Sequence, residues 1–528
     1  MAGDAKTDVL HHEDAHTEGG AASVAETPDD QMSSWECLKS NPKIVLCALY
    51  ANIGALMIGY DNLALAVCLS MPAFQMTFAS NVNGSLIIPA HWQSAWNAMY
   101  NVMTLVGSLV AAETIDWFGC RFGFLFTAIT AAAGVALNFV AKNPAEFLGG
   151  KMITGFAVGI AMTVGQKYVS EIAPLRIRGI ALSFNTICMN LGFLIAISAT
   201  FSRISIMEEA AFRHIFAAAW AFPGAFLIGL PLIPESPYWY AQKNQPDEAK
   251  RSLERLSPKN QSIQARFDQI MSAIEAERAL MAVTGSAISL LDCFRGSNWR
   301  RTRIVLICMS MNIVVGGVLS ANAPYFLNQT GLASYTVTML IQIGISLGVL
   351  SALVNVVLMS RFNQRPLMMG GIGLCAIMFL IMGIAGCFSR TQSNLLLIGI
   401  VLQITPLTYG PSVGAAMAVA GEVSSVSLRS KTIGVGIAFN YLFSTIWLVV
   451  LPYLFNEDQA NLGGKIGFVF FAEALLFMAF VWFAVPNTNG RTYEELDQMF
   501  ESRVPTRKFS TWKLDDETTA AAEKAADL

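Results

Sequence analysis

The chain has 528 residues, of which 54% are hydrophobic and only 13% are charged, and its formal net charge is −3. Soluble proteins average about 25% charged residues, so this composition excludes an ordinary soluble globular protein. The slightly acidic balance gives no indication of a nucleic-acid partner. Because about 20 apolar residues in a helix cross a hydrocarbon core about 30 Å thick, the long uncharged segments predict a polytopic α-helical membrane protein.

Twelve membrane spans are expected after a polar N-terminal tail (1–42) that does not resemble a cleaved signal peptide. They are placed near 44–67, 92–113, 121–141, 147–169, 178–202, 214–234, 303–327, 335–359, 366–387, 393–420, 431–454 and 465–485. An even number of spans puts both termini on one side of the membrane.

The distribution of basic residues predicts which side this is. Short connections with Lys or Arg, at Arg121, Arg178, Arg361 and Arg429, fall on the same side as the charged segment in the middle of the chain. The positive-inside rule makes that side cytoplasmic. Two sequons on the opposite side are glycosylation candidates, at Asn83 and Asn328.

The chain also contains an internal repeat. Glu171 and Arg178 are seven positions apart, and so are Glu422 and Arg429. DWFGCR (116–121) is echoed by SRFNQR (360–365) at nearly the same offset. We therefore expect two parallel copies of one six-helix unit. The expected division is a first bundle (43–234), a cytoplasmic linker with short amphipathic helices (235–302), a second bundle (303–485) and a polar C-terminal tail (486–528).

Several motifs resemble those of the sugar porter family of the major facilitator superfamily, particularly its fungal maltose and hexose permeases. They are GYD (59–61), SEIAPLRIRG (170–179), PESPYWY (234–240), VSLRSKT (426–432) and NGRTYEELDQMF (489–500). The resemblance extends from about residue 35 to 500. It implies an all-α fold of two six-helix bundles and alternating access to a cavity between them.

Asp61 is expected to take part in proton coupling. It lies inside an apolar span, where a charge costs about 2.5–3.5 kcal/mol on insertion scales and is usually functional. The resemblance places the proton site of symporters at this aspartate and its cationic partner on the fourth span, where this chain has Lys151 in GGKMITG. The structural alternative is an Asp61 that forms hydrogen bonds within its bundle and a Lys151 that extends to an interface.

Three cytoplasmic charge sets resemble the inner gate of the family. Salt bridges there would hold an outward-open state and would break when the cavity opens inward. The alternative is loop charge that follows the positive-inside rule. The sets are Asp116 with Arg121, Glu171 with Arg178, and Glu422 with Arg429.

The substrate site follows the family pattern only in part. Side-chain amides suit sugars because they offer both donors and acceptors to hydroxyl groups. On the seventh span, however, Ile313 and Val318 replace two usual amides. Each remaining polar residue could instead form an ordinary interhelical hydrogen bond. The substrate-binding candidates are Thr186, Asn312, Asn322, Asn440 and Tyr441.

These observations predict a secondary transporter that imports a disaccharide, hexose or polyol with protons. The alternatives are a transporter or exporter of another metabolite and a nutrient sensor that does not transport. An enzyme is not expected, and neither is a metal site, a cofactor other than the coupling proton, or a nucleic-acid partner. We expect a monomer in the lipid bilayer, with the plasma membrane as its location.

Overall fold

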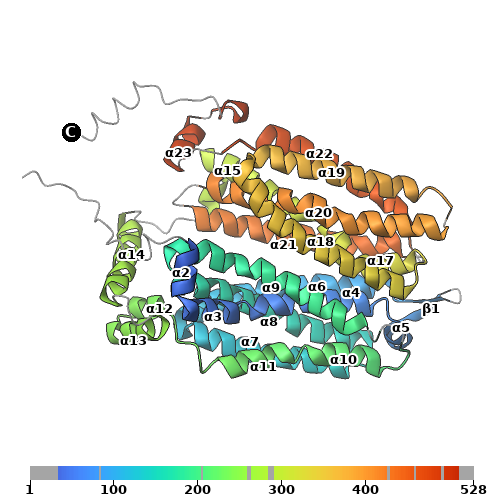
Figure 1. The fold of residues 1–528 in the computed structure, drawn as a ribbon, viewed down its shortest axis with the longest axis horizontal. Coiled ribbons are helices and arrows are strands. Elements are labelled where there is room, and N and C mark those ends of the chain that lie inside the picture. The colour runs from blue at the N-terminus through green and yellow to red at the C-terminus, as the bar shows by residue number, and fades with distance from the viewer. Residues whose placement is uncertain are drawn as a thin grey trace, which may run out of the picture.

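The computed structural model describes residues 34–82, 85–201, 203, 206–257, 263–283, 290–389, 391–424, 428–456, 459–488, 493–502 and 504–509. Within these residues, 12 helical segments are long and apolar enough to cross a membrane. They lie side by side in one elongated body (Figure 1). The twelve-span, all-α fold predicted from hydropathy is therefore confirmed.

The first half of the chain supplies six of these segments. The first span is divided at Asn52, and the sixth is divided between Ala218 and Ala221. The elements are α2 (Ser34–Ser40), α3 (Pro42–Ala51), α4 (Ile53–Cys68), α5 (Pro72–Phe78), β1 (Ser80–Val82), β2 (Ser85–Ile87), α6 (Ala90–Phe118), α7 (Cys120–Val140), α8 (Pro144–Ile172), α9 (Leu175–Phe201), α10 (Ala210–Ala218) and α11 (Ala221–Gly229).

Short helices separate the two halves, and the second half supplies the other six segments. The linker elements are α12 (Pro237–Gln242), α13 (Pro246–Leu256), α14 (Ile263–Val283) and the 3-10 helix η1 (Leu290–Phe294). They are followed by α15 (Gly296–Val314), α16 (Gly317–Ala321), α17 (Ala323–Gln329), α18 (Ser334–Arg361), α19 (Gln364–Ala385), α20 (Gln392–Val423), α21 (Arg429–Phe455), η2 (Gly463–Lys465), α22 (Ile466–Ala484), α23 (Tyr493–Glu501) and η3 (Thr506–Lys508).

The two halves repeat the same helix packing. In the first bundle α4 packs on α9, and α8 packs on both α6 and α7. In the second bundle the equivalent helix α15 packs on α21, and α20 packs on both α18 and α19. The repeat expected from the paired Glu and Arg motifs is thus present in the fold as two parallel six-helix bundles.

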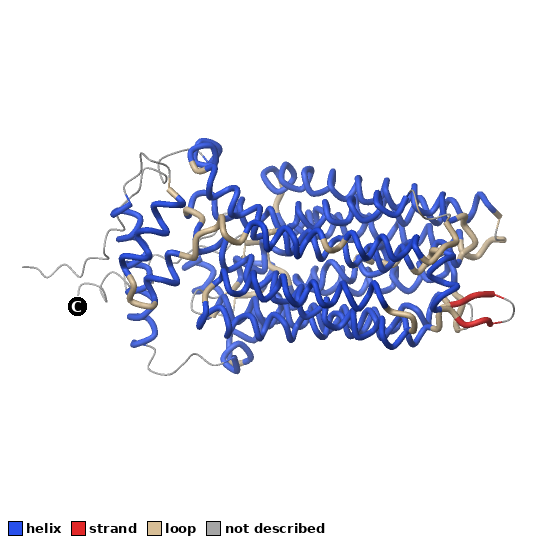
Figure 2. Tube along the Cα trace, turned by 90° about the horizontal axis from the view of Figure 1, so that it is seen from below, coloured by secondary structure: helices blue, strands red, loops and turns tan. Residues whose placement is uncertain are grey.

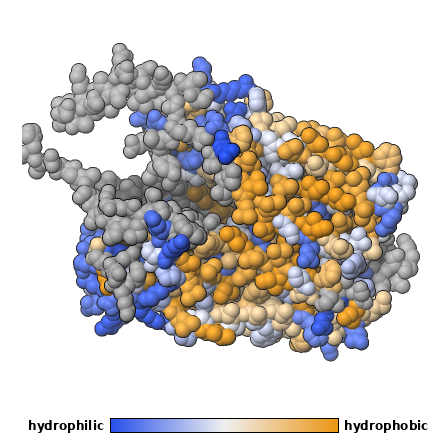
Figure 3. Space-filling model, viewed as in Figure 1, coloured by the Kyte–Doolittle hydropathy of each residue, from blue (hydrophilic) through white to orange (hydrophobic). Residues whose placement is uncertain are grey.

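The two ends of the molecule differ. The linker helices α12–α14 and the C-terminal α23 gather at one end, which we call the linker end (Figure 1). The short antiparallel pair β1 and β2 marks the opposite end, which we call the hairpin end (Figure 2). On the face shown in Figure 3, apolar residues cover the middle of the body and hydrophilic residues gather toward its two ends, as a bilayer requires.

Each bundle carries its own soluble elements at the linker end. Trp239 of α12 donates from Nε1 to the backbone oxygen of Asp116 at 3.2 Å, which attaches the linker to the first bundle. Arg300 of α15 donates to the backbone oxygen of Val504 at 2.7 Å and to Oγ1 of Thr506 at 2.9 Å. These bonds attach the C-terminal segment to the second bundle.

The seventh span is interrupted at Gly316, between α15 and α16. Gly316 has φ +81°, in the left-handed region that costs other residues about 1–2 kcal/mol. A Cβ atom there would also lie 2.2 Å from Cζ of Phe379. Discontinuous helices of this kind line the substrate sites of many transporters, so the break marks a region of functional interest.

We expect Gly316→Ala to lower the free energy of unfolding by about 1–3 kcal/mol, because it adds backbone strain and overpacks the contact with Phe379. Thermal unfolding of the purified protein in detergent would measure this. The matched control is Gly370→Ala on α19, where a Cβ atom would meet nothing within 4 Å. Equal stability of the two variants would contradict the prediction.

Candidate functional site

A buried ion pair joins two helices of the first bundle. Nζ of Lys151 on α8 lies 2.5 Å from Oδ2 of Asp61 on α4. The two side chains are only 1% and 7% exposed. The sequence reasoning named both residues as partners, and the structure brings them together; their role in proton coupling stays a prediction.

A third helix completes the environment of the pair. Nζ of Lys151 lies 4.7 Å from the ring centroid of Tyr100 on α6, a cation–π distance. The Tyr100 hydroxyl is buried and has no hydrogen-bond partner among the described residues. Asp61 and Lys151 each lie seven residues from the hairpin ends of their helices, about 10 Å along the axis. The pair therefore sits at a junction of three helices in the half of the bundle nearer the hairpin end.

At the hairpin end the two bundles are held together by polar contacts. Ser94 Oγ on α6 donates to the backbone oxygen of Val449 on α21 at 2.8 Å. Asn456 donates to the backbone oxygen of Ile88 at 3.3 Å and accepts a bond from Gln93 Nε2 at 3.4 Å. α6 packs along α21, and α9 packs along α18. These contacts close the interface at the hairpin end.

At the linker end, the predicted gate residues of the first half contact their own bundle. Asp116 forms an ion pair with Lys167 of α8. Arg121 donates from Nη2 to the backbone oxygen of Leu230 at 3.4 Å. Glu171 is half-buried. Sequence reasoning did not identify Lys167, because nothing in the pattern singles it out except its place one helical turn before Glu171.

Glu235 is a second residue that sequence reasoning did not assign. Its two carboxylate oxygens accept the backbone N–H groups of Cys120 at 2.8 Å and Arg121 at 3.0 Å. It therefore caps the first turn of α7, where an acidic side chain is favoured by the helix dipole. The PESPYWY motif, which contains Glu235, was the sequence feature that could have pointed to a role for this residue.

The second half has a related arrangement built from uncharged partners. Glu422 accepts a bond from Nε2 of Gln364 at 2.7 Å, and Oε1 of Gln364 accepts one from the Thr488 hydroxyl at 2.6 Å. The side chains of Arg178 and Arg429 lie outside the described residues. The salt bridges predicted for the outward-open state thus stay a prediction.

The predicted substrate residues lie on helices of both bundles. Thr186 on α9 and Asn312 on α15 are exposed. Asn440 donates to the backbone oxygen of Met309 at 2.6 Å, and Asn322 donates to that of Val318 at 2.9 Å. Tyr441 is half-buried. The amide nitrogen of Asn440 thus bonds to another helix, and that of Asn322 bonds locally.

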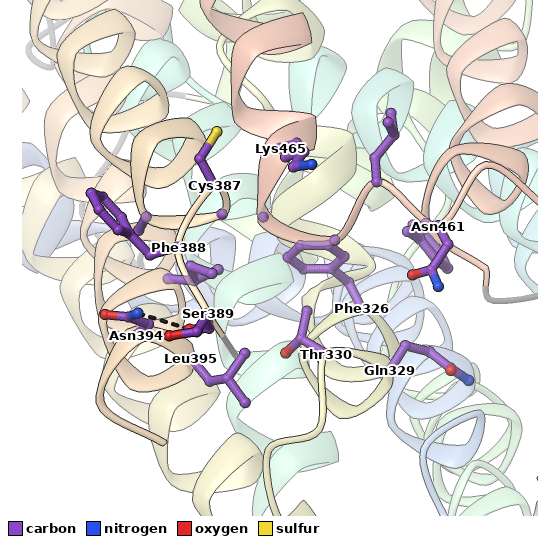
Figure 4. Close-up of a pocket in the computed structure, with 17 residues that line it drawn as sticks. Phe326, Gln329, Thr330, Cys387, Phe388, Ser389, Asn394, Leu395, Asn461 and Lys465 are labelled. Atoms are coloured by element: carbon purple, nitrogen blue, oxygen red, sulfur yellow. Dashed lines mark hydrogen bonds between the residues drawn. The ribbon is translucent and has the colours of Figure 1, made fainter. Parts of the chain in front are cut away.

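A cavity of about 280 Å³ opens elsewhere, at the hairpin end within the second bundle. Phe326, Gln329 and Thr330 line one side of it, opposite the segment that follows α19 (Figure 4). None of the five predicted substrate residues lines it.

Of the two glycosylation candidates, Asn328 lies beside this region and donates to Ser334 Oγ at 2.9 Å, whereas Asn83 lies outside the described residues.

Comparisons with known proteins agree with this geometry. A family model described as "Sugar (and other) transporter" matches residues 47–500. The MFS transporter fmqE of Aspergillus fumigatus is 28% identical, with 92% of each chain covered. The maltose permease MAL61 of Saccharomyces cerevisiae is also 28% identical, over 96% of this chain and 83% of its own. The general alpha-glucoside permease of the same yeast is 26% identical, over 94% and 81%.

A solved structure shows the same fold. The inward-open conformation of the xylose transporter XylE from E. coli superposes with a TM-score of 0.67 at 20% identity. The match covers 86% of this chain and 99% of that one.

Removing one member of the buried pair should be far more damaging than removing both. Lys151→Met leaves an unpaired buried carboxylate, which costs about 3–5 kcal/mol, whereas neutral pairs are often tolerated. We therefore expect Lys151→Met alone to lower the denaturation midpoint strongly and the double variant with Asp61→Asn to recover most of the loss. Additive effects of the two substitutions would show that the pair has no energetic coupling.

The hairpin-end closure should depend on Asn456. Asn456→Ala removes both bonds of its side chain, so we expect the equilibrium to shift toward an open hairpin end by about 1–2 kcal/mol. Spin labels at the exposed positions Met76 and Gln392, with the exposed Cys387 replaced by serine, would report the separation. Asn394→Ala, whose bond stays within the second bundle, is the matched control; the same distances in both variants would contradict the prediction.

Proposed function

Because the chain belongs to the sugar (and other) transporter family, within the major facilitator superfamily, we propose that it imports a sugar or related polyol together with protons. The multi-pass membrane fold and the permease relatives support transport across a membrane. The proposed location is the plasma membrane, with the linker end in the cytoplasm. The observation that supports proton coupling is the buried pair of Asp61 and Lys151.

Protonation of Asp61 would change the balance of charge in this pair. With a neutral Asp61, the buried Lys151 would lose its only anionic partner among the described residues. An uncompensated buried charge is costly, so the three helices α4, α6 and α8 would have to adjust. Uptake and release of a proton would therefore favour different arrangements of the first bundle, which is what coupling requires.

The adjustment has a route to the interface between the bundles. Tyr100, whose ring lies beside Lys151, is on the same helix as Ser94, which bonds to Val449 across the interface. The two residues are six positions apart, about 9 Å along α6. A shift of α6 at the ion pair would thus act on the contacts that close the hairpin end. We propose that the conformation of the structure, in which the hairpin end is closed, is the one open toward the cytoplasm.

A sugar or polyol is supported by the polar residues on α9, α15 and α21, together with the permease relatives. A second candidate is a less hydroxylated metabolite. It is favoured by two apolar residues of the seventh span, Ile313 and Val318, whose side chains offer no hydrogen bonds. A site with fewer donors and acceptors discriminates against a ligand whose hydroxyl groups would stay unpaired.

The test is uptake of labelled disaccharides, hexoses and polyols by transporter-deficient cells at two external pH values. We expect uptake to rise at the more acidic pH and to be lost in Asp61→Asn at equal surface expression. Glu248→Gln makes the same carboxyl-to-amide change on α13, outside the spans, where the half-exposed side chain pairs with Arg251. This variant should behave as the native protein.

Two outcomes would overturn the proposal. If the well-expressed native protein takes up no member of the panel, sugar import is wrong, and transport or export of another metabolite and sensing without transport are the remaining functions. If uptake occurs but is independent of pH and unchanged in Asp61→Asn, the protein is a facilitator without proton coupling.

A further inference from the structure

A carboxyl group lies alone in the last membrane span. Glu473 is the single Asp, Glu, Lys or Arg within α22 (Ile466–Ala484). An ionised side chain in such a segment costs about 2.5–3.5 kcal/mol on insertion scales, and such residues usually face partners or serve a function. None of the residues proposed above for coupling, binding or gating lies on this helix.

The contacts of Glu473 suit a neutral acid better than a carboxylate. Oε1 accepts a hydrogen bond from Nε1 of Trp447 on α21 at 3.1 Å. Oε2 is buried and has no hydrogen-bond partner among the described residues. The ring of Trp447 stacks on Phe470 with centroids 4.8 Å apart, so the carboxyl group lies beside an aromatic contact. One neutral donor is little compensation for a buried negative charge.

No cation within the described residues forms an ion pair with Glu473, in contrast to Asp61. Arg365 donates to the backbone oxygen of Trp482, which is nine residues farther along α22, about 14 Å away. No carboxylate occurs on the elements packed against α22. The titratable and charged residues of these elements are Cys308, Arg300, Arg301 and Arg303 on α15, Arg365 and Cys375 on α19, Arg429, Lys431, Tyr441 and Tyr453 on α21, Lys465 in η2, and Arg507 and Lys508 in η3.

The depth of Glu473 matches that of the ion pair in the other bundle. It lies seven residues from the hairpin end of α22, as Asp61 and Lys151 do from the hairpin ends of their own helices. Its hydrogen-bond donor is also close to the interface between the bundles. Trp447 is two residues from Val449, the acceptor of the bond from Ser94 that closes the hairpin end.

We propose that Glu473 is a second proton-binding carboxyl group of this transporter, neutral in the present conformation. When the hairpin-end contacts separate, α21 moves and water gains access to the carboxyl group of Glu473. The O–H bond of Glu473 then breaks, the proton passes to that water and the carboxylate is left with the indole N–H as its donor. The role in the cycle rests on the proposed proton coupling, whereas the protonation of Glu473 does not.

The first measurement is the infrared spectrum of the purified full-length protein in lipid. We expect the carbonyl stretch of a neutral carboxylic acid, lost in Glu473→Gln and shifted in Trp447→Phe, because the indole N–H bonds to the carboxyl oxygen. The tryptophan variant keeps this test available if Glu473→Gln fails to fold. A native spectrum whose neutral-acid band is unchanged in both variants would overturn the proposal.

The second measurement is the pH profile of uptake. We expect Glu473→Gln to flatten the profile and Trp447→Phe to move its midpoint to higher pH, because the lost donor stabilises the ionised form. Glu248→Gln is the control. If Asp61→Asn abolishes pH-dependent uptake while both of the Glu473 and Trp447 variants match the native profile, this inference fails and the proposed function stands. If native uptake is independent of pH, the proposed function fails, and the infrared result alone decides the protonation of Glu473.

Discussion

The hydrocarbon core of a bilayer offers no partners for charged or polar groups, so every such group within the spans must find one in the protein or become neutral. Asp61 meets this requirement through Lys151, across two helices of the first bundle. Among the described residues, Glu473 has only the indole of Trp447 as a hydrogen-bond partner. The predicted gate residues are not subject to this constraint, because they lie at the ends of the spans. The positions of the ionisable groups therefore separate possible proton sites from residues that act at a boundary.

The polar contacts between the bundles also indicate how the two bundles can move relative to each other. Within each bundle, long helices pack closely along one another. Across the hairpin end, a few side chains such as Ser94, Gln93 and Asn456 carry the polar contacts. Bonds of this kind contribute about 0.5–1.5 kcal/mol each. A small set of them can hold one state and yet be exchanged for contacts at the other end.

The fold could be predicted because hydropathy is a property of whole segments, and twelve apolar segments in two related sets leave few alternatives. The pairing of Asp61 with Lys151 could also be predicted, because the family resemblance places a cationic partner of this aspartate on the fourth span. The partners of the gate residues could not. Asp116 meets Lys167 and Glu422 meets Gln364 because of how helices are placed in space. The break at Gly316 and the bond between Glu473 and Trp447 likewise depend on tertiary packing. The substrate stays a proposal, because a single polar residue such as Asn440 serves a backbone carbonyl as readily as a ligand.

The soluble elements at the linker end belong to different bundles: Trp239 ties the linker helices to the first, and Arg300 ties the C-terminal segment to the second. Each bundle thus carries its own soluble elements beyond the ends of its spans. If the two bundles rotated by a few degrees relative to each other, the soluble elements would be displaced further than the middle of the spans, because they lie farther from the centre of the rotation. A protein that bound both sets of soluble elements at once would oppose this motion without contacting the spans.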